Sequence, residues 1–173
     1  MTTGELSQWH ATNPDTYLPP GLAEPRPWQD GLDIPYWEAI ERDELVVQYC
    51  DDCKAHQWGP EWLCHRCHKF DLEYVKVEPK GKIYSWERVW HPVHPALQTS
   101  CPYMVVLVEL PGADNVRMVG NLIGDPMRPV TIGEEVEAVF EHHKDADPPY
   151  TLVQWQRTRD CISSRRVQSI EVG

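Results

Sequence analysis

The 173-residue sequence predicts a mainly β fold in which an N-terminal arm and a helix precede a small cysteine ribbon and a five-stranded barrel. Three patterns lead to this prediction. Four cysteines form two CxxC pairs that ten residues separate. The segment before them repeats apolar residues at helical spacing. The segment after them alternates runs of β-branched and aromatic residues with turns that contain Gly, Pro or Asp.

Residues 1–32 are predicted to form an extended arm that docks on another protein. Five prolines interrupt residues 1–30, and polar residues dominate them, so this stretch has little core of its own. It nevertheless carries Trp9, Tyr17 and Trp28. Large apolar side chains on a segment without a core favour docking over free disorder. These three residues are therefore predicted to lie at a partner interface.

Residues 33–49 are predicted to form a helix and a lead-in strand. Asp33 is a favourable N-cap residue and Pro35 suits the first helical turn, so the helix is expected to begin there. Apolar residues recur at helical spacing as far as residue 47. The stretch 45–49 is then expected to run as a strand into the first cysteine pair.

The two pairs, CDDC at residues 50–53 and CHRC at 64–67, predict a zinc ribbon over residues 50–77. Each CxxC aims two thiolates at one point. The four ligands of one closed tetrahedral zinc site would be Cys50, Cys53, Cys64 and Cys67. A closed site leaves no position for water or substrate, so the predicted role is structural. Iron at a four-cysteine site is the alternative that spacing alone leaves open.

Other uses of the cysteines explain less of the pattern. A redox dithiol needs only one CxxC, and two disulfides need an oxidising compartment. The sequence begins MTTGE, without the basic and apolar regions of a secretory signal, so reduced thiols and a cytoplasmic location are expected. Cys101 and Cys161 lie far from the pairs and are interpreted as bystanders.

Three tryptophans lie in or beside the ribbon. Trp37 is on the predicted helix, and Trp58 and Trp62 flank the ribbon hairpin. Because Trp is over-represented among the anchors of protein interfaces, all three are predicted to contact a partner.

Residues 78–158 are predicted to form five strands, over 81–91, 103–110, 115–123, 134–143 and 150–158. Five strands with one longer connection indicate a Greek-key barrel of the OB type, whereas an immunoglobulin-like sandwich needs about seven. The second strand is nearly all apolar and is expected to be buried on both faces. In the fourth strand, period two places Glu141 on the outward face. Residues 159–173 show no clear period and are interpreted as a tail.

The charge distribution argues against two kinds of partner. The formal net charge is −11, and no segment supplies the basic face that displaces counterions from phosphates. No apolar run approaches the ~18 residues of a membrane span. Neither nucleic acid nor a membrane is therefore an expected partner.

These motifs, in this order, resemble the DUF35 family, also described as OB-fold acyl-CoA-associated proteins with a rubredoxin-like zinc ribbon. The resemblance covers about residues 33–157. Besides the double CxxC, it rests on ELVVQ at 44–48, GKIYSW at 81–86, PYMVVLVEL at 102–110 and IGEEVEAVF at 132–140.

The resemblance implies a partnership. The resemblance implies that this chain, like other DUF35 proteins, is a small, non-catalytic subunit. Such subunits work beside thiolases, thiolase-like acyltransferases or aldolases, and sometimes beside MaoC-type hydratases. The expected partner is therefore a thiolase-like catalytic subunit that cleaves or forms a carbon–carbon bond on a β-keto- or β-hydroxyacyl-CoA. No nucleophile elbow or Gly-rich phosphate loop is recognisable in the sequence, so the chain alone is expected to be inactive. The alternatives are a MaoC-type hydratase partner, a single-stranded nucleic-acid-binding module and a stand-alone acyl-CoA carrier.

The best candidate for a ligand surface is the end of the first barrel strand with the loop that follows it. Arg88 and Trp90 share one face of the strand, and His91 and His94 follow on a proline-stiffened loop. Aromatic rings stack on adenine, and Arg or His binds phosphate, so these four residues are the predicted acyl-CoA entrance. The alternative is that they belong to the core or to a subunit interface.

Overall fold

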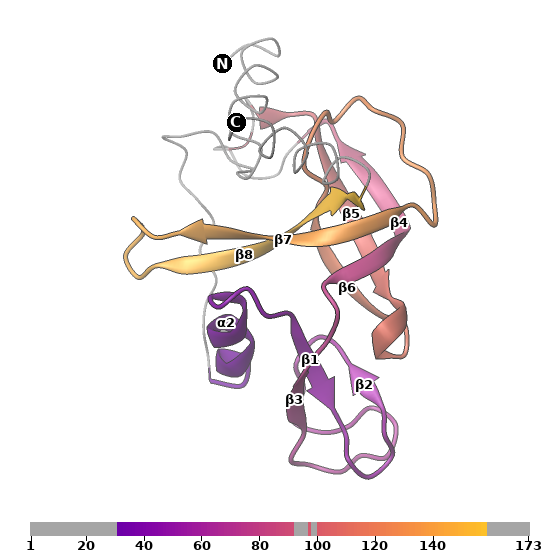
Figure 1. Cartoon of the computed structure of the whole chain (residues 1–173), viewed down its shortest axis with the longest axis vertical. Helices are drawn as coiled ribbons and strands as arrows, with labels where there is room; N and C mark the ends of the chain where they lie inside the picture. Colours follow the sequence, from indigo (N-terminus) through magenta and orange to yellow (C-terminus); the bar gives the residue numbers. More distant parts are fainter. Residues whose placement is uncertain (1–30, 92–96, 98–99, 159–173) are drawn as a thin grey trace, which may run out of the picture.

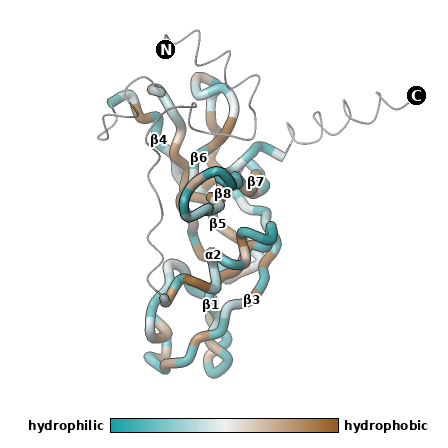
Figure 2. Tube along the Cα trace, turned by 90° about the vertical axis from the view of Figure 1, so that its left-hand side faces the viewer, coloured by the Kyte–Doolittle hydropathy of each residue, from teal (hydrophilic) through white to brown (hydrophobic). Residues whose placement is uncertain are grey.

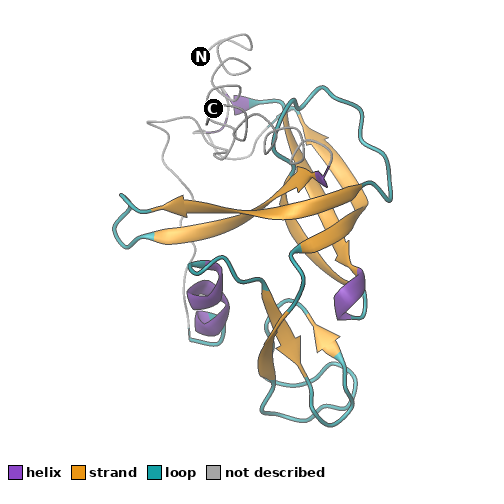
Figure 3. Ribbon diagram, in the orientation of Figure 1, coloured by secondary structure: helices purple, strands orange, loops and turns teal. Residues whose placement is uncertain are grey.

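The computed structural model describes residues 31–91, 97 and 100–158 (Figure 3). Residues 1–30 of the predicted arm, with Trp9, Tyr17 and Trp28, lie outside the described residues, as do His94 in the loop and the tail with Cys161. The elements are α2 (Ile34–Ile40), β1 (Val46–Tyr49), β2 (His56–Gln57), β3 (Glu73–Lys76), β4 (Lys80–Val89), β5 (Tyr103–Leu110), the 3-10 turn η2 (Pro111–Ala113), β6 (Val116–Asn121), β7 (Glu135–His143) and β8 (Tyr150–Arg157).

Helix α2 is shorter than the sequence pattern predicts, because it ends at Ile40 rather than near residue 47. The chain leaves the helix through a turn in which Asp43 has a left-handed φ of 60°. The β-branched Val46 and Val47 that follow pair with β3, as β-branched residues favour. At the other end, the Asp33 side chain accepts a hydrogen bond from Trp37 Nε1 at 2.7 Å, and its backbone carbonyl receives the first helical N–H groups.

The ribbon is a three-stranded antiparallel sheet in the order β2–β1–β3 (Figure 1). The central strand pairs Val46 with Lys76 on one side and Tyr49 with His56 on the other. The ribbon sheet lies below the barrel in Figure 1, and the chain passes from β3 directly into β4.

The barrel has the strand order β6–β5–β4–β7–β8. Strand β4 pairs with β5 along most of its length and with β7 only through its first residues, 80–82. The two outer strands meet where Leu122 bridges Trp155 in parallel and the Ile123 N–H donates to the Trp155 carbonyl at 2.9 Å. This closure makes a five-stranded OB-type barrel, so the predicted fold class is confirmed.

One hydrophobic core joins the helix and β1 to the barrel. Figure 2 shows hydrophobic colour along β1 and within the barrel strands, and hydrophilic colour at the turns. The least exposed side chains of this core come from α2, from β1 and the residue before it, and from the barrel strands: Ile40, Leu45, Val47, Ile83, Val106, Val108, Val136 and Trp155. The ribbon below the end of β1 has a separate small core.

Two burial predictions are wrong. Strand β5 is not buried on both faces: Met104, Val106, Val108 and Leu110 are buried, but the alternate residues are only half-buried. The strand belongs to an antiparallel barrel, in which one face meets the core and the other faces outward. Glu141 is not outward but 3% exposed, and it accepts a hydrogen bond from Gln154 Nε2 at 2.7 Å. Here the β7–β8 hairpin extends beyond the barrel over α2 (Figure 1), so the barrel's alternation no longer applies.

Candidate metal centre and docking surfaces

The two cysteine pairs form two nearly equivalent knuckles. In the first, the Lys54 N–H donates to the Cys50 carbonyl at 2.8 Å, and in the second the His68 N–H donates to the Cys64 carbonyl at 2.9 Å. Lys54 and His68 have left-handed φ values of 59° and 60°. The tight turn in each knuckle places both of its sulfurs on the same side of the backbone.

The four sulfurs converge on one point. The Sγ atoms of Cys50, Cys53, Cys64 and Cys67 all lie within 4.8 Å of one another, with Cys50 to Cys67 at 3.5 Å and Cys53 to Cys64 at 3.4 Å. Zn–S bonds of about 2.3 Å in a tetrahedron place sulfurs ~3.8 Å apart, so this geometry fits zinc. Within the described part of the chain, these side chains are the one group of three or more potential ligands close enough to hold a metal ion.

The electrostatics of the cluster also fit a cation. The backbone N–H groups of Cys67 and Arg66 lower the pKa of the Cys64 thiol to about 6. Desolvation raises the pKa of Cys53 to about 12. Four crowded thiols therefore do not all ionise by themselves, whereas a divalent cation stabilises all four thiolates together. The site suits a structural zinc ion, which would hold the two knuckles in register.

A pair of buried glutamines, which the sequence analysis did not single out, supports the second knuckle. Gln57 Nε2 donates to Gln48 Oε1 at 3.0 Å, and both side chains are less than 5% exposed. The Gln48 Oε1 atom also accepts the Glu61 N–H at 2.9 Å, and Gln57 Oε1 accepts the His65 N–H at 2.9 Å. These bonds fix the 58–65 loop on the sheet. Glutamine in a strand carries no sequence signal for such a role.

The three tryptophans near the ribbon have different surroundings. Trp58 is half-buried, with its ring 4.5 Å from that of Tyr36, and it packs against the main core. Trp37 also contacts Tyr36, with ring centroids 5.1 Å apart, and its Nε1 donates a hydrogen bond to Asp33. Trp62 is 68% exposed at the ribbon. The predicted interface role remains a prediction for all three, and Trp62 has the most surface available for it.

The residues of the predicted acyl-CoA entrance are only partly available to a ligand. Arg88 Nε donates to the Pro126 carbonyl at 2.7 Å, and the guanidinium lies 5.7 Å from the Trp86 ring, so this side chain holds a neighbouring loop. Trp90 is 53% exposed, and His91 beside it is exposed. Burial raises the pKa of the nearby Cys101 thiol, which is the opposite of what a nucleophilic cysteine requires.

Contacts between the ribbon and the barrel include a hydrogen-bonded His–Asp pair. His56 on β2 lies with Nδ1 3.0 Å from Asp114 Oδ2, and its backbone N–H donates to the same oxygen at 3.0 Å. Asp114 belongs to the turn between β5 and β6. A similar pair, His142 to Asp43 at 2.9 Å, ties β7 to the turn after α2. None of the helices within residues 31–91, 97 and 100–158 is long and apolar enough to span a bilayer.

Comparison with known families separates the same two units. The ribbon, over residues 37–73, matches the rubredoxin-like zinc ribbon domain of ChsH2, and residues 74–141 match the C-terminal OB-fold domain of ChsH2. Among solved structures, a chain of the Ltp2–ChsH2(DUF35) aldolase is 33% identical with a TM-score of 0.64, and the match covers 76% of this chain and 98% of that one. The chain belongs to the DUF35 family.

Other relatives of this DUF35 chain differ in length and description. A probable enoyl-CoA hydratase alpha subunit of Thermomonospora curvata is 35% identical over 77% of this chain, which spans 40% of that subunit. A DUF35 domain-containing scaffold protein of Methanocaldococcus jannaschii is 29% identical over 68% of this chain and 82% of its own length. A DUF35 protein of unknown function from Sulfolobus solfataricus shares the fold, with a TM-score of 0.52 at 10% identity over 91% of this chain and 99% of that one.

Proposed function

We propose that this DUF35 chain is the non-catalytic subunit of an acyl-CoA enzyme complex whose catalytic subunit is thiolase-like. The reaction of the complex would cleave or form a carbon–carbon bond on a β-keto- or β-hydroxyacyl-CoA. The observation that carries the proposal is the 33% identity to a chain of an aldolase over 98% of that chain. The chain is therefore similar to a whole component of that assembly.

The chemistry of the described residues supports a non-catalytic role for this subunit. The metal centre uses all four sulfurs, so a zinc ion bound there has no open position for substrate. Burial raises the pKa of Cys101, the thiol that lies outside that centre among the described residues. The reactive groups would then belong to the partner, while the exposed Trp90 and His91, with His94, border its acyl-CoA entrance.

The proposal is tested by co-expressing the chain with candidate thiolase-like subunits encoded in the same genome. A stable complex should co-purify, and cleavage of a β-hydroxyacyl-CoA to a shorter acyl-CoA and a carbonyl product should require both subunits. Trp90→Ala combined with His91→Ala should raise KM more than it lowers kcat, because these side chains would bind ground state and transition state alike. Cleavage by the isolated chain would contradict the proposal.

A hydratase partner is the second candidate. It is favoured by the 35% identity to the probable enoyl-CoA hydratase alpha subunit, although that relative is much longer than this chain. The same co-purification with hydratase subunits distinguishes the two. A complex that hydrates an enoyl-CoA and leaves β-hydroxyacyl-CoA uncleaved would replace the thiolase-like partner with a hydratase.

A further inference from the structure

The second knuckle of the ribbon presents large apolar side chains to solvent. Trp62 is 68% exposed, Phe70 is 67% exposed and Leu63 is 37% exposed. Leu63 and Phe70 are bridge partners in an antiparallel pair, so their side chains are cross-strand neighbours. These three residues, here called the knuckle patch, lie within three residues of the metal ligands Cys64 and Cys67 in the chain.

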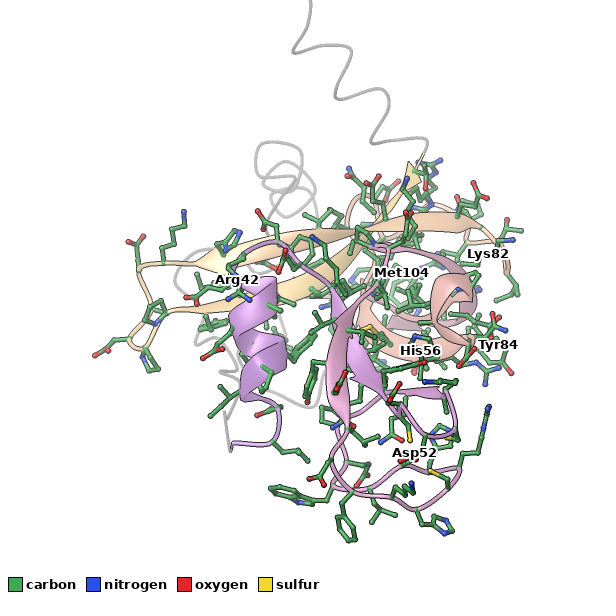
Figure 4. The ribbon with its side chains drawn as sticks, turned by 60° about the horizontal axis from the view of Figure 1, so that its bottom comes forward. Arg42, Asp52, His56, Lys82, Tyr84 and Met104 are labelled. Atoms are coloured by element: carbon green, nitrogen blue, oxygen red, sulfur yellow. The ribbon has the colours of Figure 1, made fainter. Side chains whose placement is uncertain are left out.

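The knuckle patch is at the end of the ribbon that is remote from the barrel. Phe70 adjoins Lys69, which forms an ion pair with Asp52 of the first knuckle. Figure 4 shows Asp52 at this end, well separated from His56, where the ribbon meets the barrel. The patch therefore projects away from the body of the subunit.

The knuckle patch lies outside both hydrophobic cores. The buried residues of the ribbon core are Cys50, Ala55 and Cys64, with Cys53 and Leu72 packed against them. Trp62 and Phe70 belong neither to this core nor to the main one. Exposed apolar patches of this kind mark interaction sites, and Trp is among the side chains that dominate binding energy.

The electrostatics around the patch favour an apolar protein contact. The whole chain has a net charge of −11. Residues 50–71 contain four acids (Asp51, Asp52, Glu61, Asp71) and three bases (Lys54, Arg66, Lys69), which gives −1 and leaves −10 for the rest. When zinc binds, the four thiolates and the Zn²⁺ ion together add −2, so the zinc-loaded ribbon carries −3 and both parts of the subunit are acidic. A polyanion would be repelled by both parts, whereas an uncharged apolar recess carries no charge for the subunit to repel.

The area of the patch indicates what kind of interface it joins. Two aromatic side chains bury at most about 150–250 Å² each, so the patch offers a few hundred Å², less than the roughly 800 Å² per partner of a standard stable interface. A second copy held by this patch alone would have too small a contact. The patch has the size of an anchor within a larger interface between different subunits.

We infer that the knuckle patch is an anchor that inserts into an apolar recess on the catalytic subunit. The inference rests on the proposed function and adds Leu63 and Phe70 to the interface. It also gives the metal a role in assembly, because the ligands that flank the patch hold its side chains in place for binding. Zinc then pre-organises the anchor, which lowers the entropic cost of association.

The test measures the affinity of the zinc-loaded full-length chain for its co-expressed catalytic subunit by calorimetry. Trp62→Ala and Phe70→Ala should each weaken binding at least tenfold, with unchanged zinc content and melting temperature. Trp62→Phe should recover part of the loss. The matched controls are Val119→Ala and Met127→Ala, whose side chains are 68% and 52% exposed on the barrel half and should bind as the wild type does.

The outcomes separate this inference from the proposed function. If the wild-type chain binds neither a thiolase-like nor a hydratase subunit, the proposed function fails. If the wild-type complex forms and the two alanine variants bind with unchanged affinity, the anchor is wrong and the function stands. Loss of self-association in sedimentation, or loss of single-stranded DNA binding, in place of the loss of subunit binding would assign the patch to another occupant and overturn the inference.

Discussion

The ribbon and the barrel bury very different cores. The barrel shares one continuous core with α2 and β1, including Trp155, Ile83 and Val136, each at most 1% exposed. The separate apolar core around the knuckles has only Cys50, Ala55 and Cys64 as buried members. Apolar burial at about 25 cal/mol per Å² supports the barrel, but three small side chains cannot offset the conformational entropy of the knuckles. Metal ligation has to supply the missing folding free energy of the knuckles. The large aromatic side chains of the ribbon are then not needed in its core and can contact another subunit.

The largest effect should come from breaking the metal centre. Cys64→Ser removes a ligand that is fully buried, so the ribbon should lose its zinc and unfold locally. The barrel should remain folded, because its core does not include the knuckles. Elemental analysis should find one zinc per wild-type chain and none in the variant, and hydrogen exchange should lose protection in β2 and β3 but keep it in β5, β7 and β8.

The matched control is Cys101→Ser, since this cysteine lies outside the cluster. It should leave zinc content unchanged. Full zinc occupancy in the Cys64→Ser variant would show that three sulfurs suffice. Global unfolding of that variant would show that ribbon and barrel are one cooperative unit.

The stability of the barrel should depend on side-chain packing and not on metal binding. At its seam, a Cβ on Gly120 would lie 2.7 Å from Trp155 Cδ1 and 3.1 Å from the Val153 carbonyl oxygen, so the two outer strands would have to separate. Gly120→Ala is therefore expected to lower the free energy of unfolding by about 1–3 kcal/mol, as overpacking typically does. Zinc content should not change.

Gly112→Ala provides the comparison, because nothing lies within 4 Å of an added Cβ there. Its free energy of unfolding should stay within about 0.5 kcal/mol of the wild type in urea titrations. Equal losses in the two glycine variants would mean that backbone freedom, and not the seam, determines the stability of this half.

The sequence was most informative where residue type and spacing fix geometry. Two CxxC pairs leave few arrangements other than one four-sulfur site, and strand 103–110 was placed with both ends correct. The chain's membership of the DUF35 family and its OB-type barrel were also predicted. These features depend on local pattern, and their physical basis is ligand chemistry and β propensity.

The features that were not predicted depend on contacts between distant segments. Helical spacing continued past Ile40, but pairing of Val46 and Val47 with β3, about thirty residues later, decided the end of α2. Glu141 follows an outward period, yet the protruding hairpin buries it against Gln154. The exposure of Phe70 also follows from tertiary structure, because the ribbon core is complete without it.

The smallest expected effect is at the His56–Asp114 pair that joins the two regions. The hydrogen bond from His56 lowers the pKa of Asp114 below its ordinary 3.8. A carboxyl whose pKa is lower in the folded state contributes stability that is complete above the unfolded pKa and is lost as pH falls through the folded pKa. The pair is partly exposed, so its contribution is small and screened by salt.

In His56→Ala, the Asp114 pKa measured by carboxyl ¹³C NMR should rise toward 3.8. Zinc occupancy is checked at each pH because acid also protonates the thiolates. Hydrogen exchange at neutral pH should quicken in β2 and stay constant in β8. An unchanged Asp114 pKa in that variant would mean that the backbone N–H of residue 56, and not the imidazole, sets the ionisation of this carboxylate.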